Sequence, residues 1–279
     1  MHAFRRLSLF SALALTLAGG LLATPASAQL AEEVPFITSP DNVTLEMLRI
    51  AGVGSADHVI DLGSGDGRIV ILAASRFGAS GLGVEIDPQL VQQSNRHARD
   101  AGVAGRVRFL EQDLFKTELA GATVITMYLL PEFNLQLRPA LLALKPGTRI
   151  VSHDWDMGDW KPDETTLLPV PDKKVGLEKS SKVHLWLVPA RVDGLWCGNG
   201  ASLQVAQHHQ QFEARLARGA TLRQLAGRIR GDQLRSAPQA DATLELHAAG
   251  DALHVVSAGG ALSGLRGEFR RASGASCPG

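Results

Sequence analysis

Short apolar runs alternate with longer amphipathic stretches between residues 58 and 188. The short runs have the character of buried strands, and the longer stretches repeat apolar residues with helical spacing. The predicted order is strand 58–61, helix 68–77, strand 81–85, helix 88–101, strands 107–110 and 123–128, helix 131–144 and strand 149–152. This alternation predicts an α/β fold in which a mostly parallel sheet carries helices on both faces.

Two further strands, 166–170 and 183–188, follow with no long helix between them. Strands joined without a crossover helix pair antiparallel, so we expect an edge hairpin. Ahead of the first strand, a covering helix is predicted, with Ser39 as its cap and Pro40 at its first position. The sequence therefore predicts a seven-stranded, Rossmann-like domain over residues 29–190.

The pattern changes after residue 190 to alternation of single apolar and polar positions. Phe212, Ala214 and Leu216, for example, are separated by charged residues, and turn segments such as Gly231-Asp232 divide the runs. Alternation of this kind is typical of antiparallel strands. We expect a second, small all-β domain over residues 191–279, either an antiparallel sheet or a barrel.

The first 28 residues have the organisation of a secretory signal peptide. Arg5 and Arg6 precede an apolar stretch at 7–22, and Ala26-Ser27-Ala28 provides the small residues of a cleavage site. A membrane anchor is the alternative, but Gly19-Gly20 interrupts the stretch, which is short against the roughly 20 residues that span a bilayer. We expect cleavage after Ala28, export to the periplasm or medium, and no stable membrane span afterwards.

The two cysteines, Cys197 and Cys277, both lie in the C-terminal β segment. In an exported protein, a pair at the two ends of one small domain predicts a disulfide, and two unpaired buried thiols are the alternative.

Charge is balanced over the whole chain, with 28 basic and 28 acidic residues. Residues 29–190 contain 16 basic and 21 acidic residues, a net charge of −5, whereas residues 191–279 contain 10 and 7, a net charge of +3. The split indicates two segments of different character, while the zero charge of the whole chain predicts no global attraction to a polyanion, so no nucleic acid is expected to bind. No group of residues has metal-ligand spacing, and no metal is expected.

A glycine-rich turn joins the first predicted strand to its helix, with the spacing Asp-x-Gly-x-Gly-x-Gly from Asp61 to Gly67. Glycines allow the backbone to approach a ligand closely, and the helix start favours polar ligand groups. Glu85 follows at the end of the second strand, where a carboxylate can accept both hydroxyls of a ribose. Nicotinamide-dependent oxidoreductases share this acid, but their glycines more often follow Gly-x-Gly-x-x-Gly.

A third acidic segment, Glu111-Gln112-Asp113-Leu114-Phe115, follows the third strand. The three segments in this order resemble the motifs of class I S-adenosylmethionine-dependent methyltransferases. The resemblance implies that Asp113 meets the adenine amino group and that an apolar neighbour packs on the ring. Taken singly, each acid also has a structural interpretation as a cap or a solvated loop residue. The residues expected to bind S-adenosylmethionine are Asp61, Gly63, Ser64, Gly65, Gly67, Glu85, Ile86, Asp113 and Leu114.

Four further segments make the resemblance specific to one family: 35–40, 127–134, 144–148 and 152–160. They are similar to the family typified by the ATP synthase c-subunit lysine methyltransferase and its bacterial relatives, over about residues 34–190. The resemblance implies methyl transfer to a lysine side chain of a protein. The export signal and the β segment depart from that family, which leaves the acceptor and the oligomeric state open.

Four polar residues near the ends of the fourth and fifth strands are candidates to orient or deprotonate the acceptor lysine, because open α/β sheets bind ligands at this edge. They are Tyr128, Glu132, His153 and Asp154. Tyr128 has an alternative interpretation as a packed core edge, and His153 as a satisfied loop histidine. Two other functions remain as alternatives: an exported, non-catalytic binding protein that uses its β segment, and a nicotinamide-dependent oxidoreductase.

Overall fold

The computed structural model describes residues 37–279, except 175–176, 199, 239–241 and 278–279. The predicted signal peptide and its cleavage site therefore lie outside the described residues.

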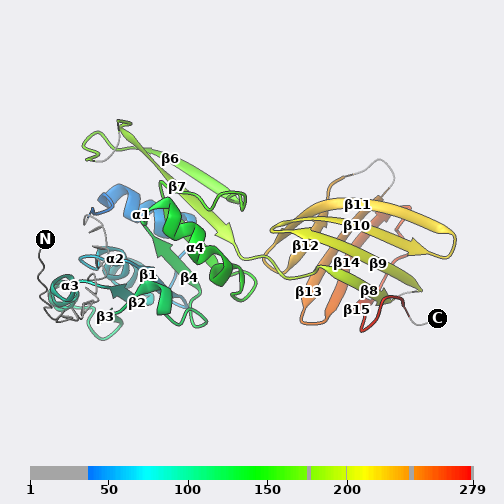
Figure 1. Ribbon diagram of the computed structural model, residues 1–279, viewed down its shortest axis with the longest axis horizontal. Coiled ribbons are helices and arrows are strands. Elements are labelled where there is room, and N and C mark those ends of the chain that lie inside the picture. Colours follow the sequence, from blue (N-terminus) through cyan, green and yellow to red (C-terminus); the bar gives the residue numbers. More distant parts are fainter. Residues whose placement is uncertain (1–36, 175–176, 199, 239–241, 278–279) are drawn as a thin grey trace, which may run out of the picture. The chain divides into compact units, whose positions relative to one another are not determined.

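The first part of the described chain is built on a seven-stranded sheet of order β3-β2-β1-β4-β5-β7-β6 (Figure 1). The strands are β1 (His58–Leu62), β2 (Ser80–Glu85), β3 (Val107–Glu111), β4 (Val124–Met127), β5 (Arg149–His153), β6 (Glu164–Pro169) and β7 (Ser180–Leu187). Five strands run parallel, β7 pairs antiparallel with β5, and β6 pairs antiparallel with β7. The predicted Rossmann-like sheet with an antiparallel edge hairpin is confirmed.

Helices cover both faces of this sheet. They are α1 (Asp41–Ile50), α2 (Arg68–Phe77), α3 (Pro88–Asp100) and α4 (Pro131–Leu142), with a short 3-10 turn, η1 (Leu114–Lys116). On one face, Met47 of α1 is buried with Val124 and Val151 of the sheet. On the other, Leu141 of α4 is buried with Ile125. The burial of apolar side chains on both faces explains why the central strands read as continuous apolar runs.

The start of α1 differs from the prediction. The helix begins at Asp41 with Pro40 as the residue before it, and no side chain caps its N-terminus. The hydroxyl of Ser39 lies 2.8 Å from Nδ1 of His153, so the predicted capping role of Ser39 is wrong. A buried histidine nitrogen offers this hydroxyl a tertiary hydrogen bond in place of a local one.

The C-terminal part of the chain forms a closed eight-stranded barrel of order β10-β11-β12-β13-β14-β15-β8-β9. Its strands are β8 (Gly194–Gly198), β9 (Ala201–His208), β10 (Gln211–Arg218), β11 (Thr221–Arg230), β12 (Gln233–Ser236), β13 (Ala242–Ala249), β14 (Ala252–Gly260) and β15 (Glu268–Arg271). Alternate residues point inward to a core of their own, which includes Trp196, Leu216 and Phe269. Closure leaves the sheet without unpaired edges. Of the two predicted forms, the barrel is the one found.

Cys197 and Cys277 are joined in a disulfide, with Cα atoms 5.5 Å apart, as predicted. The bond ties the tail that follows β15 to β8, the first strand of the barrel. Beside it, the guanidinium of Arg271 lies 4.2 Å from the ring centre of the buried Trp196. The pairing of β15 with β8 is therefore reinforced by a covalent and a cation–π contact.

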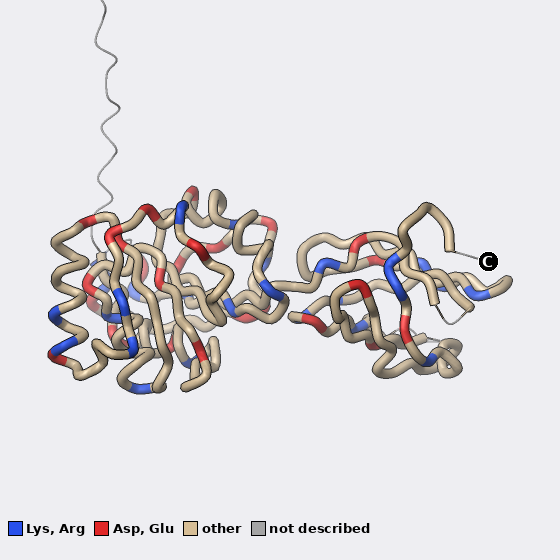
Figure 2. Tube along the Cα trace, turned by 90° about the horizontal axis from the view of Figure 1, so that it is seen from below, with Lys and Arg blue, Asp and Glu red and all other residues tan. Residues whose placement is uncertain are grey.

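Charged residues of both signs are interspersed along the trace of each part (Figure 2). Arg235 and Glu245 of the barrel, for example, form an ion pair of 2.9 Å. Within the residues that the structure describes, no helix has the length and apolar character needed to cross a membrane.

Candidate active site

The glycine-rich turn lies between β1 and α2. Gly63, Gly65 and Gly67 have φ angles of 74°, 53° and 80°, in the left-handed region. At Gly67 a Cβ atom would lie 2.7 Å from the ring of Phe109, so this position requires glycine for space as well as for conformation. The chain thereby turns tightly before the start of α2, and at the three glycines no side chain covers the backbone.

Glu85, at the end of β2, is held against this turn. One carboxylate oxygen accepts a hydrogen bond from the Gly65 amide at 2.9 Å, and the other accepts from the amides of Ile86 and Asp87 at 2.8 and 3.1 Å. A carboxylate has further lone pairs for ligand hydroxyls. The acid predicted to bind a ribose is therefore placed beside the glycine turn with its orientation fixed.

Asp61 lies below the turn and is almost completely buried. Its carboxylate accepts a 2.6 Å hydrogen bond from the hydroxyl of Thr126 on β4. Burial raises the pKa of Asp61 to about 7; the Thr126 hydrogen bond opposes this rise, and the carboxylates of Glu85 and Asp66 add to it. In this structure the Asp61 side chain joins β1 to β4, two residues before Gly63.

An apolar surface adjoins Glu85 at the ends of β2 and β3. Ile86 is 69% exposed and Phe115 is 38% exposed. Asp113 begins η1, where its carboxylate accepts a hydrogen bond from the Phe115 amide at 2.9 Å and lies 3.3 Å from Lys116. Exposed apolar side chains beside fixed carboxylates suit an adenosine, which combines a flat apolar base with polar edges. Phe115 was not predicted, although its place beside Asp113 and Leu114 was a usable signal.

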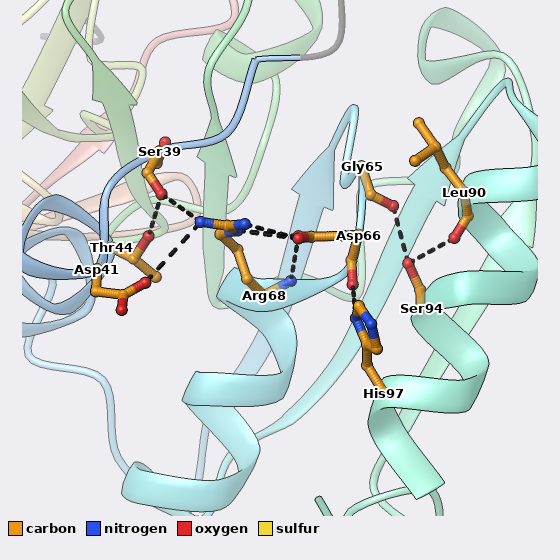
Figure 3. A network of polar contacts seen from close by, with 9 residues as sticks. All are labelled: Ser39, Asp41, Thr44, Gly65, Asp66, Arg68, Leu90, Ser94 and His97. Atoms are coloured by element: carbon orange, nitrogen blue, oxygen red, sulfur yellow. Dashed lines mark hydrogen bonds and ion pairs between the residues drawn. The ribbon is translucent and has the colours of Figure 1, made fainter. Parts of the chain in front are cut away.

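Arg68, the first residue of α2, ties the turn to the segment before α1 (Figure 3). Its Nη2 lies 2.7 Å from the carboxylate of Asp66, and its Nη1 donates to the Ser39 carbonyl at 3.0 Å. The Arg68 guanidinium holds the pKa of Asp66 below its usual range, against the opposing effect of burial. The second acid of the turn is thus kept charged and oriented.

Helix α3 holds the turn from the other side (Figure 3). The hydroxyl of the buried Ser94 donates to the Gly65 carbonyl at 2.8 Å, and Nδ1 of His97 lies 3.1 Å from the Asp66 carbonyl. Gly65 therefore has its amide held by Glu85 and its carbonyl held by Ser94. The turn is therefore fixed before any ligand binds.

Beyond β4 and β5, three of the four predicted catalytic residues come together. The rings of Tyr128 and His153 stack, with centres 3.9 Å apart. Nε2 of His153 lies 2.9 Å from the Ser181 hydroxyl and 3.4 Å from the Asp154 carboxylate. Glu132 lies on the first turn of α4, and none of the hydrogen bonds, ion pairs or ring contacts described joins it to these three residues.

The environment of His153 keeps its ring neutral. Burial lowers the pKa of His153 to about 4, with Asp154 opposing the change and Lys173 adding to it. Burial, followed by the charge of Asp154, raises the pKa of Tyr128, so its hydroxyl keeps its proton. At neutral pH the stacked side chains of Tyr128 and His153 are therefore both uncharged.

Asp154 is the charged member of this group. It has a φ of 63°, unusual for a residue with a side chain, and its carboxylate accepts from the Lys182 amide at 2.9 Å. Nζ of Lys173 lies 2.7 Å from the same carboxylate. The Asp154 carboxylate is therefore held in place by the Lys182 amide and by an ion pair with Lys173.

The cofactor turn and the Tyr128 group are close neighbours. A Cβ atom at Gly63 would lie 3.0 Å from the side chain of Leu129, the residue after Tyr128. The carboxyl ends of neighbouring parallel strands meet at one edge of the sheet, where open α/β folds bind ligands. A ligand on the turn would therefore extend toward the residues that follow β4.

Comparisons with known proteins agree with this geometry. A sequence model described as the ANTKMT methyltransferase domain matches residues 61–164. The chain is 41% identical over 133 residues to a protein-lysine N-methyltransferase of Saccharolobus islandicus, covering 47% of this chain and 83% of that protein. It is 38% identical over 109 residues to the ATP synthase c-subunit lysine N-methyltransferase of Mus musculus, covering 39% of this chain and 44% of that protein.

A solved structure is also similar. The RNA methyltransferase from Salinibacter ruber, in complex with S-adenosyl-L-homocysteine, shares 47% identity with a TM-score of 0.50, covering 56% of this chain and 96% of that one. S-adenosylmethionine is accordingly the cofactor, for which Glu85, Asp113 and the Gly63–Gly67 turn are present in order. The chain spans most of the archaeal relative and less than half of the mouse one. On this similarity, the chain belongs to the protein-lysine N-methyltransferase family, within the class I S-adenosylmethionine-dependent methyltransferases.

Proposed function

We propose that this methyltransferase modifies the side-chain nitrogen of a lysine in a protein. The observation that carries the proposal is the stacked Tyr128–His153 pair with the Asp154 carboxylate, adjoining the cofactor turn through Leu129. Relatives in the archaeon and the mouse are named for the same acceptor.

The residues of this chain hold both reactants. The Gly63–Gly67 turn and Glu85 bind the cofactor's polar groups, and Ile86 lies where the base can pack. S-adenosylmethionine, when bound, would supply a methyl group on a positively charged sulfur, and a nucleophile that attacks the methyl carbon in line would displace the sulfur as a neutral thioether. In such a reaction the alignment of the reactants and the exclusion of water contribute most to the rate.

The acceptor side attracts and orients an ammonium group. Tyr128 supplies a hydroxyl that stays protonated, and the Asp154 carboxylate, whose charge Lys173 partly offsets at 2.7 Å, lies beside the stacked pair. His153 has both ring nitrogens engaged and its pKa lowered to about 4, so it orients Tyr128 and does not serve as the proton acceptor. The lysine passes its proton to solvent water as it enters this group, because desolvation there favours the neutral amine.

RNA is the acceptor named for the Salinibacter relative. The α/β part of this chain is acidic, with 16 basic and 21 acidic residues over 29–190. A polyanion binds chiefly through basic groups, so this balance favours a protein acceptor over RNA.

The acceptor is tested with the purified chain and S-adenosylmethionine that carries a labelled methyl group. Cell extract is offered after RNase treatment in one arm and after protease treatment in the other, and labelled peptides are sequenced by mass spectrometry. We expect the label on lysine, and we expect Glu85→Ala to abolish it through loss of cofactor binding. Label that survives protease and is lost with RNase would refute the lysine proposal.

We infer in addition that residues 1–28 direct export and are removed. The signal-like composition of this segment motivates the inference, and the Cys197–Cys277 disulfide supports it, because such bonds persist in oxidising compartments. Intact-mass analysis of the protein from fractionated cells should show a chain that begins at Gln29 outside the cytoplasm. A full-length chain confined to the cytoplasm would contradict it.

A further inference from the structure

Ser39 has hydrogen bonds on both sides of the active site. It is 4% exposed. Its carbonyl accepts from Nη1 of Arg68, which in turn holds Asp66 in the cofactor turn (Figure 3). Its hydroxyl lies 2.8 Å from Nδ1 of His153, 114 residues away in the chain. The Ser39 backbone therefore contacts Arg68, which supports the cofactor turn, and the Ser39 side chain contacts His153, next to Tyr128.

The surroundings of His153 define which ring nitrogen carries the proton. Nε2 lies 3.4 Å from a carboxylate oxygen of Asp154, and an ionised carboxylate only accepts hydrogen bonds. The proton of a neutral ring is accordingly favoured on Nε2, which also faces the Ser181 hydroxyl at 2.9 Å. Nδ1 is then an acceptor, and the Ser39 hydroxyl is its donor.

The ring of His153 determines in turn how Tyr128 lies. The two rings stack at 3.9 Å with planes inclined by 30°, so a rotation of the imidazole displaces the phenol. His153 is 1% exposed and held at both nitrogens, which leaves its ring one orientation. A histidine is commonly fixed in one tautomer by the hydrogen bond to its second nitrogen.

We propose that Ser39 is a positioning residue that holds His153 as the Nε2–H tautomer and thereby fixes Tyr128 for the acceptor lysine. Because Ser39 also binds Arg68 through its carbonyl, the same residue sets the distance between Tyr128 and the cofactor turn. The effect on turnover rests on the proposed lysine methylation, whereas the tautomer is a property of the protein alone.

The tautomer is tested without any substrate. Nitrogen-15 NMR of histidine-labelled protein distinguishes a protonated from an unprotonated ring nitrogen. In the native chain we expect a protonated Nε2 and an unprotonated, hydrogen-bonded Nδ1 for His153, whose signals are identified by their loss in His153→Gln. Ser39→Ala should shift the Nδ1 signal. Asn42→Ala is the matched control: it removes a 3.0 Å hydrogen bond from Asn42, three residues further along in α1, to the Pro169 carbonyl, and it should leave His153 unchanged.

Kinetics test the consequence for the reaction. Ser39→Ala keeps the backbone carbonyl that binds Arg68, so the Kd for S-adenosylmethionine should stay within about twofold. The kcat should fall roughly ten- to hundredfold, as small displacements of positioning groups do. Ser39→Thr, which retains a hydroxyl, should recover most of the loss, and Asn42→Ala should match the native enzyme.

Distinct outcomes separate this inference from the proposed function. A protonated Nδ1 in the native protein, or an unchanged His153 spectrum in Ser39→Ala, would overturn the tautomer assignment. An active native enzyme whose kcat is unaltered by Ser39→Ala would overturn the positioning role. A native chain that binds S-adenosylmethionine but labels no lysine would refute the proposed function and leave the NMR result standing.

Discussion

At the scale of single residues, Gly67 shows how closely the cofactor turn is packed. Its φ of 80° disfavours any side chain, and a Cβ atom would meet Phe109 at 2.7 Å and Ser94 at 2.9 Å. We expect Gly67→Ala to lower the free energy of unfolding by roughly 2 to 5 kcal/mol, from backbone strain plus overpacking. Urea denaturation measures this value, and cofactor affinity should fall with it.

Gly102 provides the control for Gly67. Its φ is also positive, at 69°, but no atom lies within 4 Å of the position of an added Cβ. Gly102→Ala should therefore cost only the backbone strain, about 1 to 2 kcal/mol. If the two variants lost the same free energy of unfolding, the contact between the added Cβ atom and Phe109 would have no energetic cost, contrary to this prediction.

Asp61 makes stability depend on pH in an unusual direction. Its pKa is raised from 3.8 to about 7 in the folded chain, so the folded state binds the proton more tightly than the unfolded state. The stabilisation is complete below pH 4 and is lost as pH rises through 7. A shift of this size corresponds to a few kcal/mol.

Asp61→Asn removes this titration and keeps an oxygen that accepts from Thr126. The native chain should lose stability relative to Asp61→Asn as the pH rises from about 4 to about 7, as measured by urea denaturation across that range. Parallel profiles for the two proteins would mean that Asp61 is ionised throughout. The comparison is made as a difference because Asp57, whose pKa is lowered, affects both proteins at lower pH.

Local rules of sequence predicted some site residues and missed others. Tyr128, His153 and Asp154 were expected at one edge because strand ends in a parallel sheet meet there. Ser39 was misassigned because Ser-Pro-Asp is a strong local signal for a helix start, and its true partner, His153, is 114 residues away. A hydrogen bond between residues this far apart produces no periodic pattern in the sequence, so it could not be predicted from the sequence.

At the scale of elements, Arg68 joins the start of α2 to the segment before α1. It holds Asp66 and the Ser39 carbonyl with hydrogen bonds of 2.7 and 3.0 Å, with a third of its side chain still exposed. Arg68→Met should weaken S-adenosylmethionine binding about tenfold, because Asp66 and the turn lose their fixed orientation, a loss of about 1.4 kcal/mol. Isothermal titration calorimetry measures this change.

Arg49→Met is the matched control for Arg68. Arg49 lies in the last turn of α1, 65% exposed, and pairs only with Glu46 within one helix at 2.8 Å among the interactions described. Exposed pairs of this kind contribute little. An equal loss of cofactor affinity in both variants would indicate a general effect of charge and would contradict a specific role for Arg68.

The elements themselves were largely predictable, whereas their closure into a barrel was not. Alternation such as that of Phe212, Ala214 and Leu216 defines strands and their inward faces. Closure depends on the pairing of β15 with β8, whose residues Arg270 and Cys197 are far apart in sequence. The alternation of apolar and polar residues predicts each strand, but it does not show whether the first and last strands of the sheet pair. An open sheet and a closed barrel therefore have the same sequence pattern.

At the scale of the whole chain, the barrel has a core of its own and a covalent closure. Its buried side chains, among them Trp196, Leu246 and Phe269, form one cluster made of residues from 190 onward. The Cys197–Cys277 bond closes a loop with a sequence separation of 80 residues. A cross-link of this length restricts the unfolded chain and stabilises the fold by about 2 to 5 kcal/mol.

The Cys197→Ala/Cys277→Ala variant should therefore lower the Tm of the barrel while it leaves S-adenosylmethionine binding to the α/β part unchanged. Differential scanning calorimetry with and without the cofactor resolves the two effects, because the ligand raises the stability only of the part that binds it. A reducing agent should lower the Tm of the native chain to that of the variant and should leave the variant unaffected. If loss of the bond lowered cofactor affinity as well, the barrel and the α/β part would be one cooperative unit, and the β segment would be part of the enzyme's working structure.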